Sequence, residues 1–267
     1  MGKGKRTAAK GCAIVAAIIV GVPLLVVGVV GVKTWGPLEE AGKAMDDLER
    51  SLGAEATYVP APSGAITAER MELFLELRAT LVTACGDYGG VQKGFDSVES
   101  LEAKESGDLG DVGEAAAGLG GAALSITPFL ARYFELRNEA LLAASMGLEE
   151  YSYIYAVAYH DLLLSDRTRR EIFSDDQALS PEAALMLKGC LIGQLEAVGP
   201  EDGDALEAEL KKMAADPARL MWQDGLPEAV QASTAPYRER LDRMFCGATA
   251  GLEMERDARR AIRVALE

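Results

Sequence analysis

The sequence predicts an all-α protein in which a single N-terminal transmembrane helix precedes a multi-helix soluble domain. Residues 11–32 form an uncharged run of 22 residues, and about 20 apolar residues suffice to cross the hydrocarbon core of a bilayer. Beyond this run, Ala, Leu and Glu are abundant and runs of β-branched residues are scarce, a composition that favours helices. Hydrophobic residues make up 49% of the chain, which excludes a disordered exported region.

Charge and composition divide the chain into four parts: a basic cytoplasmic tail over residues 1–10, a transmembrane signal anchor over 11–34, a juxtamembrane amphipathic helix and linker over 35–65, and a helical extracytoplasmic domain over 66–267. The tail holds four Lys or Arg residues, whereas Lys33 alone follows the apolar run closely, and basic flanks stay in the cytoplasm. A cleaved signal peptide is the alternative, although its apolar core is shorter, about 7–15 residues, and ends at a small-x-small site. We therefore expect a single-pass protein of the cell inner membrane whose C-terminal domain lies in the periplasm or outside the cell.

The exported part is strongly acidic. Four of the 27 basic residues precede the apolar run, whereas all 42 acidic residues follow it. Such a surface repels phosphate backbones and anionic lipid head groups. We therefore expect no nucleic-acid partner and membrane contact through residues 11–34, while cations or basic proteins stay open as partners.

The juxtamembrane segment begins with a short amphipathic helix. Its apolar residues recur at heptad a and d spacing; they are Leu38, Ala41, Met45, Leu48 and Leu52. One interpretation packs this helix on its own domain; the other is a homodimer through the anchor and residues 38–52. Pro60 and Pro62 then predict a linker over 57–64.

The first domain helix starts at Thr67, which is a suitable N-cap. Gly86 and two further glycines close behind predict its end, and a second helix is expected from Val91. Residues 111–125 are so rich in Ala and Gly that helix and loop both stay open. Pro128 follows a capping threonine and predicts the start of the next helix.

A helix predicted over residues 148–164 carries the most distinctive pattern of the chain. Tyr151, Tyr155 and Tyr159 lie at i, i+4 and i+8 and therefore share one face. Tyrosine supplies large contact area with a polar tip, so this stripe could be a partner surface. The alternative, which we favour, is a core helix whose phenols reach the edge of the domain.

The C-terminal third predicts three more helical regions. Ser180 caps a helix that runs to Gly199, and a short helix ends near Asp216. A final helical region follows Pro227. Its expected inner face is Tyr237, Leu241, Met244, Phe245, Leu252 and Met254. A basic group ends the chain and is interpreted as charge at a helix C-terminus; it comprises Arg256, Arg259, Arg260 and Arg263.

The search for catalytic chemistry is negative. His160 is the single histidine, so sites that need several histidines cannot be built. Cys-x-x-Cys, phosphate-loop and nucleophile-elbow motifs are missing from the sequence. Glu72 with Glu76, and Glu135 with Glu139, are same-face carboxylate pairs of a kind common on solvated helices. We expect no catalytic, cofactor or metal site, no bound cofactor, and a structural role for His160.

Three cysteines, Cys85, Cys190 and Cys246, fall in the exported part among apolar residues. An odd number prevents complete pairing, and one disulfide could form in three ways. We expect free buried thiols, which behave as small hydrophobes.

These observations favour a structural or protein-interaction module of the cell envelope that binds another envelope protein. A hydrolase built around His160 or a carboxylate pair is the first alternative. A sensor that binds a small ligand or a cation is the second.

Overall fold

The computed structural model describes residues 39–52, 58–102, 128–165, 180–199, 202–217 and 219–256. Within these ranges the chain is helical and contains no strand, so the all-α prediction is confirmed. The described residues include no helix that is long and apolar enough to cross a membrane. The predicted anchor over 11–34 and the segment 111–125 lie outside the described residues.

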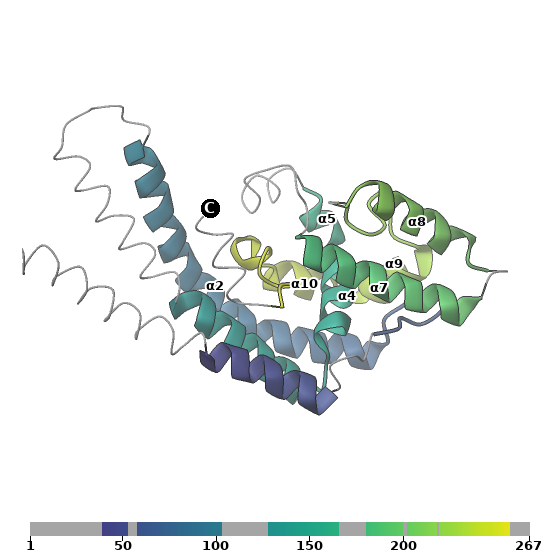
Figure 1. Cartoon of the computed structure of the whole chain (residues 1–267), viewed down its shortest axis with the longest axis horizontal. Helices are drawn as coiled ribbons and strands as arrows, with labels where there is room; N and C mark the ends of the chain where they lie inside the picture. The colour runs from purple at the N-terminus through teal and green to yellow at the C-terminus, as the bar shows by residue number, and fades with distance from the viewer. Residues whose placement is uncertain are drawn as a thin grey trace, which may run out of the picture.

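Within the described ranges, nine helical segments carry the fold, and Figure 1 shows their arrangement. Two of them span residues 39–52 and 128–143. The others are α2 (Ala68–Glu102), α4 (Leu148–Ala158), α5 (His160–Leu163), α7 (Pro181–Val198), α8 (Asp204–Ala215), α9 (Glu228–Thr234) and α10 (Arg238–Met244). Two 3₁₀ turns, Ala235–Tyr237 and Gly247–Thr249, complete the list for the described part of the chain.

Helix α4 is the centre of the molecule and packs against α2, α7 and α9. Nine of its eleven residues are buried, because its sequence is apolar or aromatic nearly all round. The predicted helix over 148–164 forms as α4 and α5, which are separated by a turn at Tyr159. The most aromatic segment of the chain is therefore buried in the core.

The helix over 39–52 packs on its own domain. Met45 and Leu48 belong to the main core, and Ala41 packs with Tyr133 and Phe134 in a second, smaller cluster. The apolar face that the heptad spacing predicts is therefore covered by the domain itself. A homodimer through this segment and the anchor stays a prediction.

The predicted linker is held against the domain rather than free. Gln194 donates to the Pro62 carbonyl at 3.0 Å, and the Tyr153 hydroxyl donates to the Gly64 carbonyl at 2.8 Å. Gly64 has φ +73°, and a Cβ there would lie 2.9 Å from the Tyr153 hydroxyl. Only glycine satisfies both conditions without strain, so this turn fixes where α2 begins.

Two helix starts form as predicted, whereas one predicted helix end is wrong. The Thr67 and Ser180 hydroxyls accept from backbone amides three residues on, at 3.3 and 3.1 Å. Helix α2, however, continues through Gly86 and its neighbouring glycines to Glu102, so no second helix begins at Val91. Glycine lowers helix stability by about 1 kcal/mol per residue but does not forbid helical dihedrals.

The final helical region is also broken where a continuous inner face was predicted. Pro236 lacks an amide hydrogen and lies in a 3₁₀ turn between α9 and α10. The chain leaves α10 at Phe245 in an extended conformation, with φ −73° and ψ 130°. Beyond it the backbone forms the 3₁₀ turn Gly247–Thr249, turns over residues 250–254 and a bend at Arg256. We call residues 245–256 the C-terminal strap.

Candidate functional site

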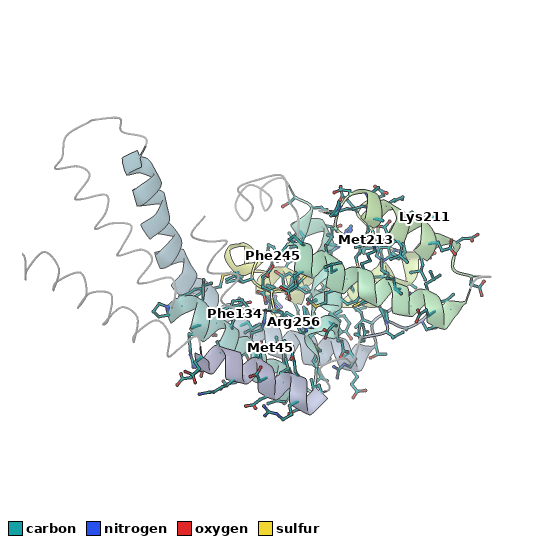
Figure 2. All side chains as sticks on the ribbon, in the orientation of Figure 1. Met45, Phe134, Lys211, Met213, Phe245 and Arg256 are labelled. Atoms are coloured by element: carbon teal, nitrogen blue, oxygen red, sulfur yellow. A yellow bond between two sulfur atoms is a disulfide. The ribbon has the colours of Figure 1, made fainter. Side chains whose placement is uncertain are left out.

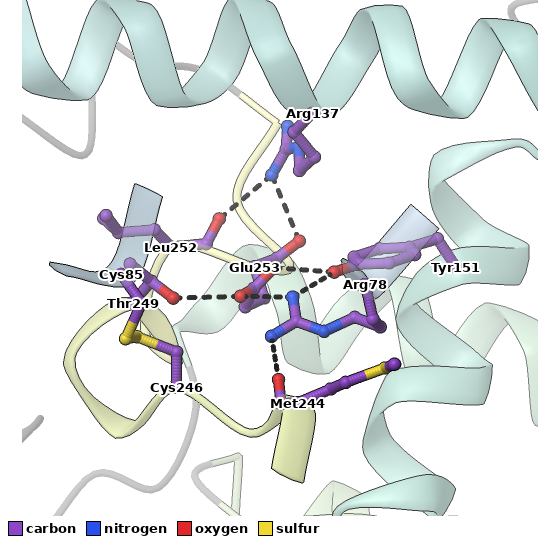
Figure 3. Close-up of polar contacts among 9 residues, drawn as sticks. All are labelled: Arg78, Cys85, Arg137, Tyr151, Met244, Cys246, Thr249, Leu252 and Glu253. Atoms are coloured by element: carbon purple, nitrogen blue, oxygen red, sulfur yellow. Dashed lines mark hydrogen bonds and ion pairs between the residues drawn. A yellow bond between two sulfur atoms is a disulfide. The ribbon is translucent and has the colours of Figure 1, made fainter. Parts of the chain in front are cut away.

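A fully buried arginine on α2 is the centre of the strongest polar cluster. The Arg78 guanidinium donates to Glu253 Oε1 at 2.6 Å, to the Tyr151 hydroxyl at 3.0 Å and to the Met244 carbonyl at 2.9 Å (Figure 3). Arg78 and Glu253 are both 0% exposed. Burial alone would lower the pKa of Arg78, but Glu253 and the neighbouring tyrosines raise it well above its ordinary value. Arg78 therefore keeps its charge despite its burial.

The Glu253 carboxylate accepts three side-chain hydrogen bonds. Its Oε1 accepts from Arg78 and from the Thr249 hydroxyl at 3.0 Å, and its Oε2 accepts from the Tyr151 hydroxyl at 2.6 Å. A buried carboxylate is tolerated only when such bonds replace its hydration. Because these donors come from α2, α4 and the strap itself, the carboxylate ties the strap to both helices.

A second buried arginine holds the strap from the other side. Arg137 on the helix 128–143 donates to the Leu252 and Glu253 carbonyls at 2.9 and 3.1 Å. It also donates to the Asn138 side chain, and its guanidinium lies 4.6 Å from the Phe134 ring centroid. Burial lowers the pKa of Arg137. Its acceptors are neutral, and they include backbone carbonyls of the strap that lie outside any α-helix.

Tyr151, Tyr155 and Tyr159 are each 0% exposed and form what we call the tyrosine face of α4. The Arg78 guanidinium lies 5.3 and 5.6 Å from the ring centroids of Tyr155 and Tyr159, and the strap residue Phe245 lies 5.1 Å from Tyr159. The structure thus places the stripe in the core, beneath α2 and the strap, and its phenols do not reach the edge of the domain as the favoured interpretation expected. It does not present these rings as an accessible surface.

Two of these phenols make no hydrogen bond. The hydroxyls of Tyr155 and Tyr159 are buried without a partner among the described residues, in contrast to that of Tyr151. Burial raises the pKa of all three phenols above the ordinary tyrosine value. They are therefore neutral, and their rings serve packing and the cation of Arg78.

A disulfide joins the strap to α2. Cys85 pairs with Cys246 at a Cα–Cα distance of 6.0 Å, so the expectation of free thiols is wrong for these two residues. Among the described cysteines, Cys190 is the free one; it is buried, and burial raises the pKa of its thiol to about 12. The sequence could not choose the pair because 161 residues separate its members, and their proximity depends on the whole fold.

His160 is 4% exposed and bonds to backbone. Its Nε2 lies 2.9 Å from the Trp222 carbonyl, and its Nδ1 lies 3.4 Å from the Asp161 carboxylate. Trp222 has φ +59°, a conformation that is uncommon for a large residue and needs support. The imidazole supports that turn, which agrees with the structural role predicted for it.

One member of each predicted carboxylate pair forms an ion pair with an arginine. Glu72 bonds to Arg240 at 2.8 Å, and Glu135 bonds to Arg132 at 2.8 Å. Across the described residues, no three His, Cys, Asp or Glu side chains gather in a group that could hold a metal ion. What the structure shows of these residues is ion pairing.

Arg256 has a different role from the one predicted. It lies outside any helix, so the helix-terminus interpretation is wrong for this residue. Its guanidinium lies 2.6 Å from Glu149, 3.3 Å from Glu49 and 4.0 Å from Glu182. Figure 2 shows it near the middle of the molecule, above Met45. It thus connects the strap to α4, α7 and the helix 39–52, whereas Arg259, Arg260 and Arg263 lie outside the described residues.

Sequence reasoning missed the buried cluster, although one signal was present. Arg78 lies on the apolar face of its helix, four residues after Phe74 and seven before Cys85. A charged side chain on an apolar helix face either reaches solvent or, if it is buried, pairs with an opposite charge. Its partner Glu253 is 175 residues away, so the pairing itself has no local signature.

Comparison with known proteins identifies no relative, because no family model, curated protein or solved structure matches the chain. Any function proposed for it rests on its own residues. The charged groups and phenols of the buried cluster interact with one another, and these interactions position the strap.

Proposed function

We propose that this chain is a membrane-anchored, extracytoplasmic helical protein that serves as a structural or protein-interaction module of the cell envelope. Residues 11–34 would supply the anchor. The observation that carries the proposal is the disulfide between Cys85 and Cys246. Disulfides persist in oxidising compartments and are rare in the cytoplasm, and this agrees with the orientation that the basic tail favours.

The use of the charged residues supports a binding role over a catalytic one. The most deeply buried ionic groups, Arg78, Arg137 and Glu253, are bonded to the fold itself. His160 bonds to a backbone carbonyl and a neighbouring carboxylate. A general base needs reach to a substrate proton, and these groups are occupied by structural partners.

The outer face of α7 is the surface that best fits a partner. Leu185 is 70% exposed and Ile192, seven residues on, is 42% exposed. Val59 is 47% exposed and would lie 3.0 Å from a Cβ at Gly193, next to Ile192. Single exposed apolar residues are ordinary, whereas a group of them indicates an interaction site. We call Leu185, Ile192 and Val59 the α7 patch.

The charge around the α7 patch supports a partner of stated chemistry. Glu182 and Glu196 flank the patch along the helix, and Lys188 is the one basic residue of α7. The exported part of the chain is acidic as a whole. We therefore propose an envelope protein that presents an apolar contact bordered by Lys or Arg side chains, because complementary charge favours that encounter.

Photo-crosslinking in intact cells tests the patch. A photoreactive residue at position 185 or 192 should form one discrete adduct with another protein. The matched control is position 142, because Leu142 is a 37% exposed leucine on the helix 128–143. Equal adducts from 142 and 185, or none from either patch position, would contradict the patch. An adduct of twice the chain's mass would instead identify self-association.

A reporter fused after Glu267 tests the location independently. A reporter that works only in the exported compartment should be active, and one that works only in the cytoplasm should not. The opposite result, or a mature chain that begins after the apolar run, would remove the anchored topology while leaving the crosslinking result interpretable.

A further inference from the structure

We propose that the disulfide Cys85–Cys246 is a redox-sensitive latch for the C-terminal strap. Its two-electron reduction by a dithiol releases the strap from the tyrosine face of α4, while α4 and α7 stay folded. The inference goes beyond the anchored, protein-binding function, because it concerns a conformational device within the domain.

The strap has little structure of its own. Its local backbone bonds span three residues each, such as Thr249 to the Cys246 carbonyl at 3.3 Å and Leu252 to the Thr249 carbonyl at 2.8 Å. A segment without a regular helical ladder keeps its conformation through what it is attached to. The attachments are the disulfide, the bonds from Arg78 and Arg137, and the ion pairs of Arg256.

The body of the domain has a core that does not depend on the strap. Helix α7 packs directly on α4 and on α8. Its residues Leu187, Cys190 and Leu191 are 0% exposed. The strap contributes Ala250 and Met254 to the main apolar core, and Phe245 packs against it beside Tyr159. Loss of the strap would leave the packing of α7 on α4 and α8 in place.

The polar attachments are poorly suited to hold the strap alone. A buried ion pair such as Arg78–Glu253 gains little net stability, because the desolvation of both charges offsets their attraction. The disulfide acts differently, because it keeps Cys85 and Cys246 together although 161 residues separate them. The conformational entropy that it removes from the open chain grows with the length of the loop it closes. The covalent bond is thus the attachment whose loss changes the balance most.

The chemistry of release is ordinary thiol–disulfide exchange. Cys85 is partly exposed, whereas Cys246 is 2% exposed, so a thiolate of the dithiol attacks Cys85 Sγ. The Cys85–Cys246 bond breaks, and the Cys246 sulfur leaves as a thiolate that takes up a proton. The second thiol of the reductant then attacks the mixed disulfide and releases the Cys85 thiol. The reductant leaves as a disulfide, having given two electrons to the protein.

Release removes the strap's share of the contacts on the tyrosine face. In the closed form the ring centroids of Phe245 and Tyr159 lie 5.1 Å apart, and Glu253 bonds to Tyr151. Departure of the strap removes both of these contacts, whereas those from Phe74 and Arg78 on α2 stay. Re-formation of the disulfide restores the strap's contacts, so the two forms interconvert with the redox state of one cysteine pair.

Hydrogen exchange read by mass spectrometry on the full-length protein in mild detergent tests the latch. The background is Cys190→Ala, so that no third buried thiol complicates the domain. Alkylation after dithiothreitol should label both Cys85 and Cys246. Amide exchange in residues 245–256 should rise at least tenfold, whereas exchange in α4 and α7 should change less than twofold, and reoxidation should reverse the effect.

Several outcomes would overturn the proposal. Failure of dithiothreitol to reduce the pair in the folded protein would show that it is no switch. Unchanged exchange in the strap after reduction would show that the polar bonds suffice. Equal increases in the strap, α4 and α7 would make the disulfide a staple of the whole fold.

A double variant, Cys85→Ala with Cys246→Ala, serves as the matched control. It should reproduce the exchange pattern of the reduced protein without reductant and should not respond to dithiothreitol. A double variant that fails to fold also counts against the latch, because the body would then depend on the bond.

Discussion

Helix α4 and the C-terminal strap are both buried, but different forces hold them. Helix α4 satisfies its backbone internally, so its side chains need only apolar and aromatic surroundings. The strap has only backbone bonds between residues three apart, and its carbonyls at Leu252 and Glu253 also accept from Arg137. A buried arginine thus adds to the sparse backbone hydrogen bonding of the strap.

The two modes of burial also respond differently to change. Apolar packing loses stability in proportion to the atoms removed. A buried ionic network instead depends on completeness, since one missing partner leaves a desolvated charge behind. Perturbations that act on the interface between α4 and the strap should separate these two behaviours.

Alkaline pH should have the largest effect, because it acts on the tyrosines at that interface. Burial raises the pKa of Tyr151, Tyr155 and Tyr159. The unfolded chain therefore loses these protons near pH 10 while the folded chain retains them. The stability is fully present below pH 10 and should fall above it by about 1.4 kcal/mol per pH unit for each tyrosine. Tyrosinate absorbance and circular dichroism should change together; ionisation that precedes unfolding would contradict burial of these phenols.

Arg78→Met should destabilise by about 3–5 kcal/mol, because it leaves the carboxylate of Glu253 buried without its cation. The double variant Arg78→Met/Glu253→Met should be more stable than Arg78→Met alone, since it removes both charges. Urea unfolding measures both. Arg132→Met is the control, because the side chain of Arg132 is 66% exposed, and it should change stability by less than about 0.5 kcal/mol. A double variant as unstable as the single one would mean that packing, not charge, decides this site.

The tyrosine hydroxyls provide a finer test. Tyr151→Phe removes a donor 2.6 Å from Glu253 Oε2 and should cost about 1–3 kcal/mol. Tyr155→Phe removes a hydroxyl that has no partner among the described residues, so it should be neutral or slightly stabilising. Both variants keep the ring. Equal urea midpoints for the two would contradict the bonding pattern of the tyrosine face.

Local sequence signals predicted the helical body well. The caps at Thr67 and Ser180 and the end of α7 at Gly199 depend on residues within a few positions of each other. The central tyrosine helix was equally clear from its periodicity. Helix α2 continues through its glycines because glycine costs a helix little free energy. Tertiary packing and the hydrogen bonds of the continuing helix can exceed that cost.

The strap could not be predicted in this way. The apolar residues Leu252 and Met254 suggested a helix face, although the segment is bent and held by distant side chains. Its partners Arg78 and Cys85 lie more than 160 residues earlier. Contacts between residues far apart in the chain produce no local pattern in the sequence. The candidate site could therefore not be predicted from the sequence.

Replacement of Arg256 should have a smaller effect than replacement of Arg78 or Tyr151. It joins the strap to three helices through Glu49, Glu149 and Glu182, but 37% of its side chain is exposed. Solvent and salt screen such contacts, so Arg256→Gln should destabilise by about 0.5–1 kcal/mol at low ionic strength and less at high salt. The control Arg243→Gln removes one exposed pair on α10 and should have no measurable effect in the same urea titration. If Arg256→Gln instead matched Arg78→Met, the outer end of the strap would be held as firmly as its buried centre, and the contrast with α4 would extend along its whole length.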